Sequence, residues 1–188
     1  MILNRWGPCG PPPAPERAPP QSHEQMKDSG KSTPSTPGLR ALATLGVAVS
    51  LHPYAYDPAA EAIGLAAARA LGLDPALMLK TLMVGVDGKP ACCVIPADKQ
   101  LSMKRVAAAF GGKTAEMMQP AKAERLTGYR VGGISPFGQK KPVPTVIDAA
   151  PCTAQKVWIN AGARGLLLGI APDDALRALS ARALPLTA

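Results

Sequence analysis

The sequence predicts a single α+β domain whose mixed, largely antiparallel sheet is flanked by helices. A chain of 188 residues with 47% hydrophobic content is long enough for one core of ordinary domain size. Helical and strand patterns are interspersed without the regular alternation typical of parallel α/β folds. No internal repeat is present, so we expect one domain over residues 38–188.

The first 37 residues differ in composition from the rest of the chain. Pro, Gly, Ser and charged residues dominate residues 1–37, which show no periodic apolar face. Such a segment cannot bury enough apolar surface to offset its loss of conformational entropy. We therefore expect residues 1–37 to be disordered.

Helix and strand signals alternate over the first part of the domain. Leu39–Leu45 has a helical pattern that ends at Gly46, and apolar residues alternate over Val47–Leu51 as in a strand. Asp57 is a typical N-cap residue and is followed by Pro, which favours the first helical turn. A helix is therefore expected over Pro58–Leu71.

A hairpin and a third helix are expected next. The apolar runs Thr81–Val86 and Ala91–Ile95 surround Asp87-Gly88, which is typical of a tight turn. Ser102–Phe110 has a helical pattern and ends at Gly111-Gly112.

The last part of the chain gives shorter signals. Glu116–Met118 is extended, and a helix is expected over Gln119–Leu126. Strand patterns follow at Val143–Ile147 and Lys156–Ile159, and a final helix is expected over Pro172–Leu179.

The positive charge of the domain is concentrated in one region. The formal net charge is +8, and residues 104–141 hold eight Lys and Arg against only Glu116 and Glu124. A concentrated basic region attracts polyanions because phosphate contacts release counterions. Nucleic acid is a reasonable partner on this basis, although a merely soluble basic face fits the charge equally well.

Cysteine and histidine usage argues against disulfides and metals. Four cysteines are present, and none forms a C-x-x-C pair: Cys9, Cys92, Cys93 and Cys152. The two histidines, His23 and His52, have no Cys or His neighbour at zinc-ligand spacing. We therefore expect free thiols, no metal and no cofactor.

Targeting signals are also missing from the sequence. No apolar run reaches the length of a membrane-spanning helix, and the first thirty residues do not have the pattern of a secretory signal. We expect a cytoplasmic protein with no membrane partner.

A glycine-dense loop over residues 132–138 is the first candidate site. It is not a nucleophile elbow, because Gly138 lies three residues after Ser135, and it is not a phosphate-binding P-loop, because Gln139 follows Gly138. Its amides could approach a ligand closely because glycine has no Cβ. The alternative is a structural loop with a tight bend.

Lys80 is the second candidate, because it stands beside the apolar run Thr81–Val86. It could reach solvent from a strand end. It could instead face a cleft and orient a carboxyl, phosphate or ester group. The nearby aromatic cluster of His52, Tyr54 and Tyr56 favours packing, and His52 has no obvious acidic partner for general-base chemistry.

Taken together, several segments of the chain resemble the YbaK/EbsC family of aminoacyl-tRNA deacylases over residues 38–182. They are His52 to Pro58, Gly72 to Pro75, Lys80 to Leu82, and the highly specific run Thr127 to Lys141. The resemblance implies a compact α+β fold and an ester substrate between an amino acid and the terminal adenosine of tRNA. It implies Cys-tRNA(Pro), and possibly Cys-tRNA(Cys), as substrate, with the cysteine thiol attacking its own carbonyl and no cofactor.

The same resemblance implies partners and site residues. The partners are the acceptor end of aminoacyl-tRNA and, in a transient complex, prolyl-tRNA synthetase. The implied catalytic residues are Lys80, with amides of Gly132 and Gly133 at the carbonyl oxygen. The implied substrate-binding residues are Tyr54, Ile63, Thr81, Ser135, Asn160 and Gly162. The implied tRNA contacts are Arg130, Lys140 and Lys141.

The sequence departs from the family pattern at three places, which leaves alternatives open. Ile63 stands where relatives commonly carry Phe, Leu65-Ala66 replaces an acidic pair, and Asn160-Ala161-Gly162 stands where Ser-Gly-Gly is frequent. The alternatives are a deacylase for another small amino acid and an inactive tRNA-binding module.

Overall fold

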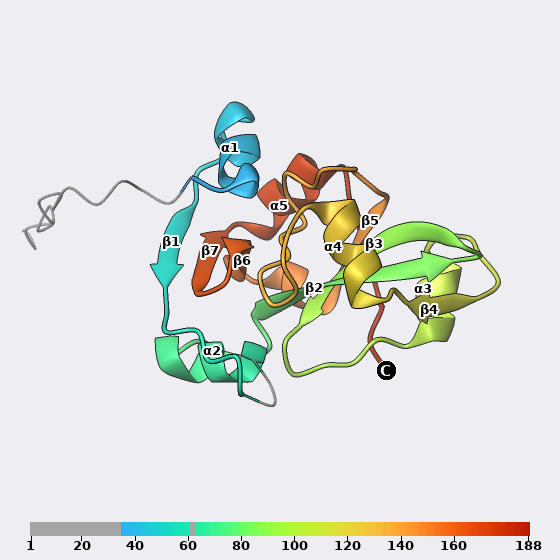
Figure 1. Ribbon diagram of the computed structural model, residues 1–188, viewed down its shortest axis with the longest axis horizontal. Helices are drawn as coiled ribbons and strands as arrows, with labels where there is room; N and C mark the ends of the chain where they lie inside the picture. The colour runs from blue at the N-terminus through green and yellow to red at the C-terminus, as the bar shows by residue number, and fades with distance from the viewer. Residues whose placement is uncertain (1–34, 61–62) are drawn as a thin grey trace, which may run out of the picture. The chain divides into compact units, whose positions relative to one another are not determined.

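The computed structural model describes residues 35–60 and 63–188 (Figure 1). The five helices of the described residues are α1 (Pro37–Thr44), α2 (Ile63–Leu71), α3 (Met103–Ala109), α4 (Pro120–Thr127) and α5 (Pro172–Leu179), with one short 3-10 turn, η1 (Ala150–Thr153). The strands are β1 (Ser50–Pro53), β2 (Met78–Val86), β3 (Lys89–Pro96), β4 (Ala115–Met117), β5 (Thr145–Asp148), β6 (Val157–Ala163), β7 (Leu166–Ile170) and β8 (Arg182–Leu184).

All eight strands belong to one mixed sheet, as predicted. Their order is β1-β7-β6-β2-β3-β5-β8, and β4 adds to the side of β2. The antiparallel pairings are β1 with β7, β6 with β7, β2 with β3 and β2 with β4. The parallel pairings are β2 with β6, β3 with β5 and β5 with β8. The long β2–β3 hairpin carries α3 and β4 near its outer end (Figure 1).

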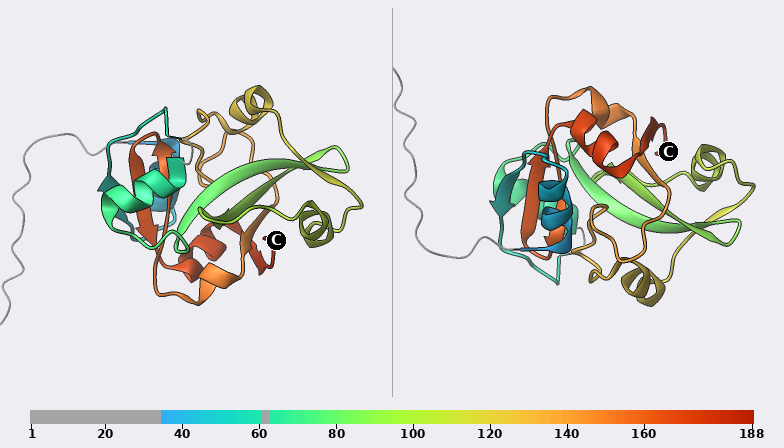
Figure 2. Two further views of the ribbon diagram at one scale, coloured as in Figure 1. Left: turned by 90° about the horizontal axis from the view of Figure 1, so that it is seen from below. Right: turned by 90° about the horizontal axis from the view of Figure 1, so that it is seen from above.

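Helices cover both faces of the β1–β7–β6 part of the sheet. Figure 2 shows α2 on one face of these strands and α1 on the other. The main core gathers Leu42 of α1 with Ile159 and Leu168, whereas Ala68 of α2 packs with Leu167 on the opposite face. Alternation along β7 explains this division, because successive strand residues point to opposite faces.

The folded unit begins a few residues before the expected boundary at residue 38. Thr36 is the N-cap of α1: its side chain accepts a hydrogen bond from Leu39 N and donates one to the carbonyl of Ala161. Residues 35–37 are therefore ordered rather than disordered, because this buried cap ties them to β6. The rest of the expected disordered segment, residues 1–34, lies outside the described residues.

The helix expected from Pro58 begins later. The Asp57 carboxylate accepts a hydrogen bond from Ala59 N at 2.9 Å, which closes a local turn. Residues 58–60 form that turn, residues 61–62 lie outside the described residues, and α2 is described from Ile63. Asp favours such turns because its side chain competes with the helix for backbone donors.

Candidate functional site

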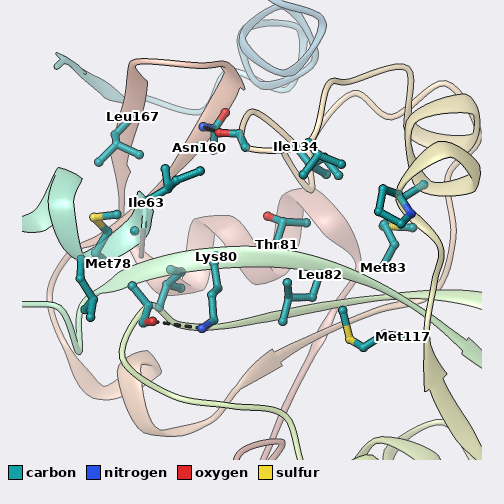
Figure 3. A pocket seen from close by; sticks show the side chains of 18 of the residues that line it. Ile63, Met78, Lys80, Thr81, Leu82, Met83, Met117, Ile134, Asn160 and Leu167 are labelled. Carbon is teal, nitrogen blue, oxygen red and sulfur yellow. Dashed lines mark hydrogen bonds between the residues drawn. The ribbon is translucent and has the colours of Figure 1, made fainter. Parts of the chain in front are cut away.

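A cavity of about 470 Å³ lies beside β2 at its boundary with β6 and β4 (Figure 3). Its described walls are mostly apolar, and the polar side chains among them belong to Tyr54, Lys80, Thr81 and Asn160. The apolar walls come from the following residues: Ile63, Leu65, Met78, Leu79, Leu82, Met83, Met117, Met118, Pro120, Val131, Ile134 and Leu167. The volume falls within the range of small-molecule sites, for which a few polar groups in an apolar cleft are typical.

Lys80 is held at the cavity by the chain segment that follows β3. Its ammonium donates a hydrogen bond to the Ala97 carbonyl at 3.0 Å, as the dashed line in Figure 3 shows. Desolvation by burial lowers the pKa of Lys80 below the usual range, and the nearby Asp98 charge opposes that shift. The burial of this cation beside an apolar cavity favours the cleft-facing interpretation over a solvent-facing strand end.

Lys80 and Thr81 point to opposite faces of β2 (Figure 3). Strand alternation requires this arrangement. The Thr81 side chain points toward Ile134, and its hydroxyl is buried without a hydrogen-bond partner among the described residues. Thr81 therefore lines the same cavity as Lys80 without touching its ammonium.

The glycine loop reaches the cavity as a tight turn. Gly133 N donates to Arg130 O at 2.9 Å, and Gly132, in the third position, has a φ of +86°. This geometry is that of a type II turn, which requires glycine at the third position. The Gly133 amide is thus already bonded within the turn, contrary to the expectation that it would face the substrate.

Three side chains fix the backbone of this turn. Val131 N donates to a Glu124 carboxylate oxygen at 2.9 Å, and this bond is the largest cause that lowers the Glu124 pKa. The Arg164 guanidinium donates to Val131 O at 2.9 Å, and Asn160 Nδ2 donates to Gly132 O at 3.3 Å. The Gly132 amide has no partner among the described residues, so it remains available to a carbonyl oxygen.

Arg164 was not identified from the sequence. It follows Gly162 in the bulged β6–β7 connection, and its guanidinium lies 5.4 Å from the centroid of the Tyr56 ring. Tyr56 in turn stands against Gly132, where an added Cβ would come within 2.6 Å of the Tyr56 hydroxyl. Nothing in the local sequence signals this packing, because it joins three segments far apart in the chain.

Asn160 and Gly162 support the turn together. Asn160 Oδ1 accepts a hydrogen bond from Gly162 N at 2.8 Å, while its amide nitrogen bonds to Gly132. Gly162 has a φ of +99° and lies against the Tyr129 ring, where a Cβ would come within 2.7 Å. Asn160 lines the cavity, whereas Gly162 does not.

Ser135 does not line the cavity either. It is fully buried, and its hydroxyl oxygen accepts a hydrogen bond from Phe137 N at 3.3 Å.

The structure brings six of the expected residues to one cavity: Tyr54, Ile63, Lys80, Thr81, Gly132 and Asn160. Desolvation by burial raises the Tyr54 pKa further above neutral pH.

The three expected tRNA contacts are exposed. Arg130 pairs with Glu124 at 3.1 Å, which offsets part of its charge, and it is the first residue of the turn. Lys140 and Lys141 are exposed and follow the glycine-dense loop, where their amides bond to the carbonyls of Thr127 and Leu126. All three cations thus belong to the segment that forms the turn or follows it.

The described cysteines, Cys92, Cys93 and Cys152, are free thiols. Cys92 and Cys93 are buried in β3, and desolvation raises the pKa of each thiol to about 12. Cys9 lies outside the described residues.

Across residues 35–60 and 63–188, no group of three or more His, Cys, Asp or Glu side chains is placed to hold a metal ion. None of the helices described is both long and apolar enough to cross a membrane.

The chain is similar to a known protein family and to several known proteins. A family described as an aminoacyl-tRNA editing domain matches residues 57–178. EbsC of Enterococcus faecalis, a candidate Cys-tRNA(Pro)/Cys-tRNA(Cys) deacylase, is 36% identical over 110 residues, which are 58% of this chain and 67% of that protein. Proline–tRNA ligase of Maridesulfovibrio salexigens is 31% identical over 70 residues, which are 37% of this chain and only 12% of the ligase.

A solved structure confirms the fold class. A candidate trans-editing enzyme for prolyl-tRNA synthetase superposes with a TM-score of 0.72 and 22% identity, covering 83% of this chain and 99% of the other. At this identity the match establishes the fold alone.

Proposed function

The chain belongs to the family of aminoacyl-tRNA editing domains, and from this premise we propose that it deacylates mischarged aminoacyl-tRNA in trans, with Cys-tRNA(Pro) as its first substrate and Cys-tRNA(Cys) as a second. One observation carries the proposal. Lys80 and the free Gly132 amide border the same apolar cavity, which also has room for an aminoacyl ester.

The reaction needs no protein nucleophile when the substrate is cysteine. The cysteine sulfur bonds to its own carbonyl carbon, the ester bond to the ribose oxygen breaks, and that oxygen takes up the proton the thiol gives up. The products are uncharged tRNA and a cyclic thiolactone. The buried thiols Cys92 and Cys93, with pKa values of about 12, are unsuited to replace the substrate's sulfur.

Two groups of the chain would stabilise the transition state. The Lys80 ammonium offsets negative charge that develops during cleavage, and the Gly132 amide donates to the carbonyl oxygen. Both groups are held in place before the substrate binds. The Ala97 carbonyl fixes the Lys80 ammonium, and the hydrogen bond from Asn160 fixes the turn that contains Gly132. Preorganised donors of this kind are worth about 3 kcal/mol each in the transition state.

The test is release of cysteine from preformed Cys-tRNA(Pro). Lys80→Ala should reduce the rate about 100-fold or more, whereas Lys99→Ala, which changes an exposed lysine near the same segment, should leave it unchanged. Full activity of Lys80→Ala would contradict the mechanism. Salt-sensitive tRNA binding without turnover by the wild type would instead favour an inactive tRNA-binding module.

A second substrate class is favoured by the cavity walls. Ile63, Met78 and Leu167 present apolar surface with no thiol-specific partner among the described residues, so a different small amino acid would also fit. Hydrophobic pockets separate such side chains by only about 1–3 kcal/mol. A panel of mischarged tRNAs at fixed salt would rank cysteine against alanine, serine and 2-aminobutyrate.

A further inference from the structure

The cavity lies along the edge of β2 rather than on one of its faces. Six consecutive residues, Met78 to Met83, all line it. Side chains of a strand alternate between two faces, so a cavity lined by every residue of a run must lie against the backbone edge. The backbone groups of β2 that point away from β3 are therefore part of the site.

The hydrogen-bond pattern identifies those groups. Ala97 N donates to Met78 O, so even-numbered residues of β2 direct their backbone groups toward β3. The prolines of β3 fit this register, because Pro96 and Pro90 stand opposite the odd-numbered Leu79 and Gly85. Odd-numbered residues therefore face the other edge.

Along that other edge, the sheet is interrupted at one residue. β6 pairs with β2 as far as Leu79, and Met118 N donates to Met83 O where the pairing with β4 begins. Thr81 lies between these two partners. Thr81 belongs to neither ladder, and no turn or loop bond among the described residues engages its backbone N–H or C=O, so both groups face the cavity without a ladder partner.

We infer that the aminoacyl group of the substrate fills this interruption by pairing with Thr81 as a single antiparallel residue. The α-amino group donates to Thr81 O, and the ester carbonyl accepts from Thr81 N–H as well as from the Gly132 amide. Two directly opposed residues in an antiparallel sheet exchange both bonds in this way, and peptides that add to sheet edges use the same pattern. The inference rests on the proposed function, since it concerns the same cavity.

This pairing also explains how the amino group is bound. The described residues that line the cavity include no carboxylate, while Lys80 is cationic. The acceptor for the substrate's ammonium is then the Thr81 carbonyl, which lies on the edge of β2 that faces away from β3. Opposed residues place their side chains on the same face, so an L-aminoacyl side chain points with Thr81 toward Ile134 (Figure 3).

Backbone amide exchange tests the pairing without any mutation. The probe is 3′-amino-3′-deoxyadenosine acylated with L-2-aminobutyrate, whose amide bond resists cleavage and whose side chain matches cysteine without the thiol. In the free protein the Thr81 amide should exchange faster than that of Leu82, which faces β3. Saturating probe should slow Thr81 exchange about tenfold or more and leave Leu82 unchanged.

Changes to the probe test the same bonds from the ligand side. Replacing its amino group by hydrogen should weaken binding about tenfold, the value expected for a hydrogen bond to a charged group. The D enantiomer, which would direct its side chain to the Lys80 face, should also bind more weakly. Thr81→Val, which keeps the backbone and replaces the hydroxyl by a methyl group, should preserve both differences.

Several results would overturn the pairing. They are no binding of the probe at millimolar concentration, equal affinity of the probe without its amino group, or a Thr81 amide that is unchanged at saturation. Such results together with turnover of Cys-tRNA(Pro) would leave the proposed function standing. Thr81 protection by the probe without turnover of any charged tRNA would support the pairing and remove the proposed function.

Discussion

Partial burial of Lys80 sets the pH range in which its ammonium is charged. Desolvation lowers its pKa, so the folded protein loses this proton at lower pH than the unfolded chain does. As pH rises between the two pKa values, the unfolded state binds more protons and stability increases. Activity that depends on the ammonium should decrease over the same interval.

This dependence can be measured on a small substrate. After subtraction of uncatalysed ester hydrolysis, kcat/KM should fall with an apparent pKa below that of an exposed lysine. Lys80→Arg stays charged throughout and should remove this alkaline limb, even if its rate is lower. An alkaline limb that persists unchanged in Lys80→Arg would assign the titration to another group.

Gly132 combines backbone conformation and close packing at a single position. Its φ is +86°, and a Cβ added there would lie 2.6 Å from the Tyr56 hydroxyl, so Gly132→Ala is strained and must also displace that ring. Gly46→Ala is a matched control, because Gly46 has a φ of +67° and nothing within 4 Å. Both should lose about 1–2 kcal/mol of stability from the left-handed conformation.

Only the change at Gly132 should affect turnover. Displacing the turn misplaces the Gly132 amide, so we expect a loss of about 100-fold in kcat. Adding Tyr56→Phe, which removes the clashing hydroxyl, should recover part of that rate. Equal turnover by Gly132→Ala and Gly46→Ala would show that the turn does not contribute to catalysis.

At the scale of elements, strong local signals were sufficient for much of the fold. The Asp87-Gly88 turn correctly predicted the β2–β3 hairpin, and both residues have positive φ values. β7 was not identified, because Leu166–Ile170 is buried on both faces and its apolar run has no alternation. α2 was extended too far because a turn at Asp57 resembles a helix cap in sequence.

The candidate site also has some features that local sequence signals predict and others that they do not. Lys80 and the glycine loop were found from residue type and motif, and both reach the cavity. The bonded state of the Gly133 amide and the interruption beside Thr81 depend on strand register. Register arises from long-range pairing, which local sequence patterns do not encode.

The C-terminal segment that follows β8 is held by one buried carboxylate. Asp148 is 2% exposed, and its two oxygens accept hydrogen bonds from Leu186 N at 2.9 Å, Thr187 N at 3.2 Å and Ala150 N at 3.1 Å. An asparagine has a single acceptor oxygen and would turn its NH₂ group toward backbone donors.

Asp148→Asn should therefore lower the free energy of unfolding by about 1–3 kcal/mol, measured by urea denaturation. The control is Asp173→Asn in the first turn of α5, where an exposed carboxylate should contribute less than about 1 kcal/mol. A loss at position 148 no larger than at position 173 would show that these bonds do not stabilise the C-terminal segment.

For the whole molecule, the proposed function gives charge and cavity separate tasks. Under that proposal the cavity would select the aminoacyl end, while a net charge of +8 would attract the tRNA phosphates at longer range. Because phosphate contacts are electrostatic and the cavity walls are mostly apolar, salt should weaken binding of whole tRNA far more than binding of an aminoacyl-adenosine.

The exposed lysines that follow the glycine-dense loop allow this division to be tested. Lys140→Ala combined with Lys141→Ala should weaken tRNA binding and reduce the slope of log affinity against log salt by about 0.7–0.9 for each phosphate that the protein no longer neutralises. Cleavage of an aminoacyl-adenosine should be unaffected, because neither side chain lines the cavity. Lys89→Ala combined with Lys99→Ala removes the same number of charges from exposed lysines elsewhere and should change the slope less. A double variant with an unchanged slope would place the tRNA backbone on another face of the domain.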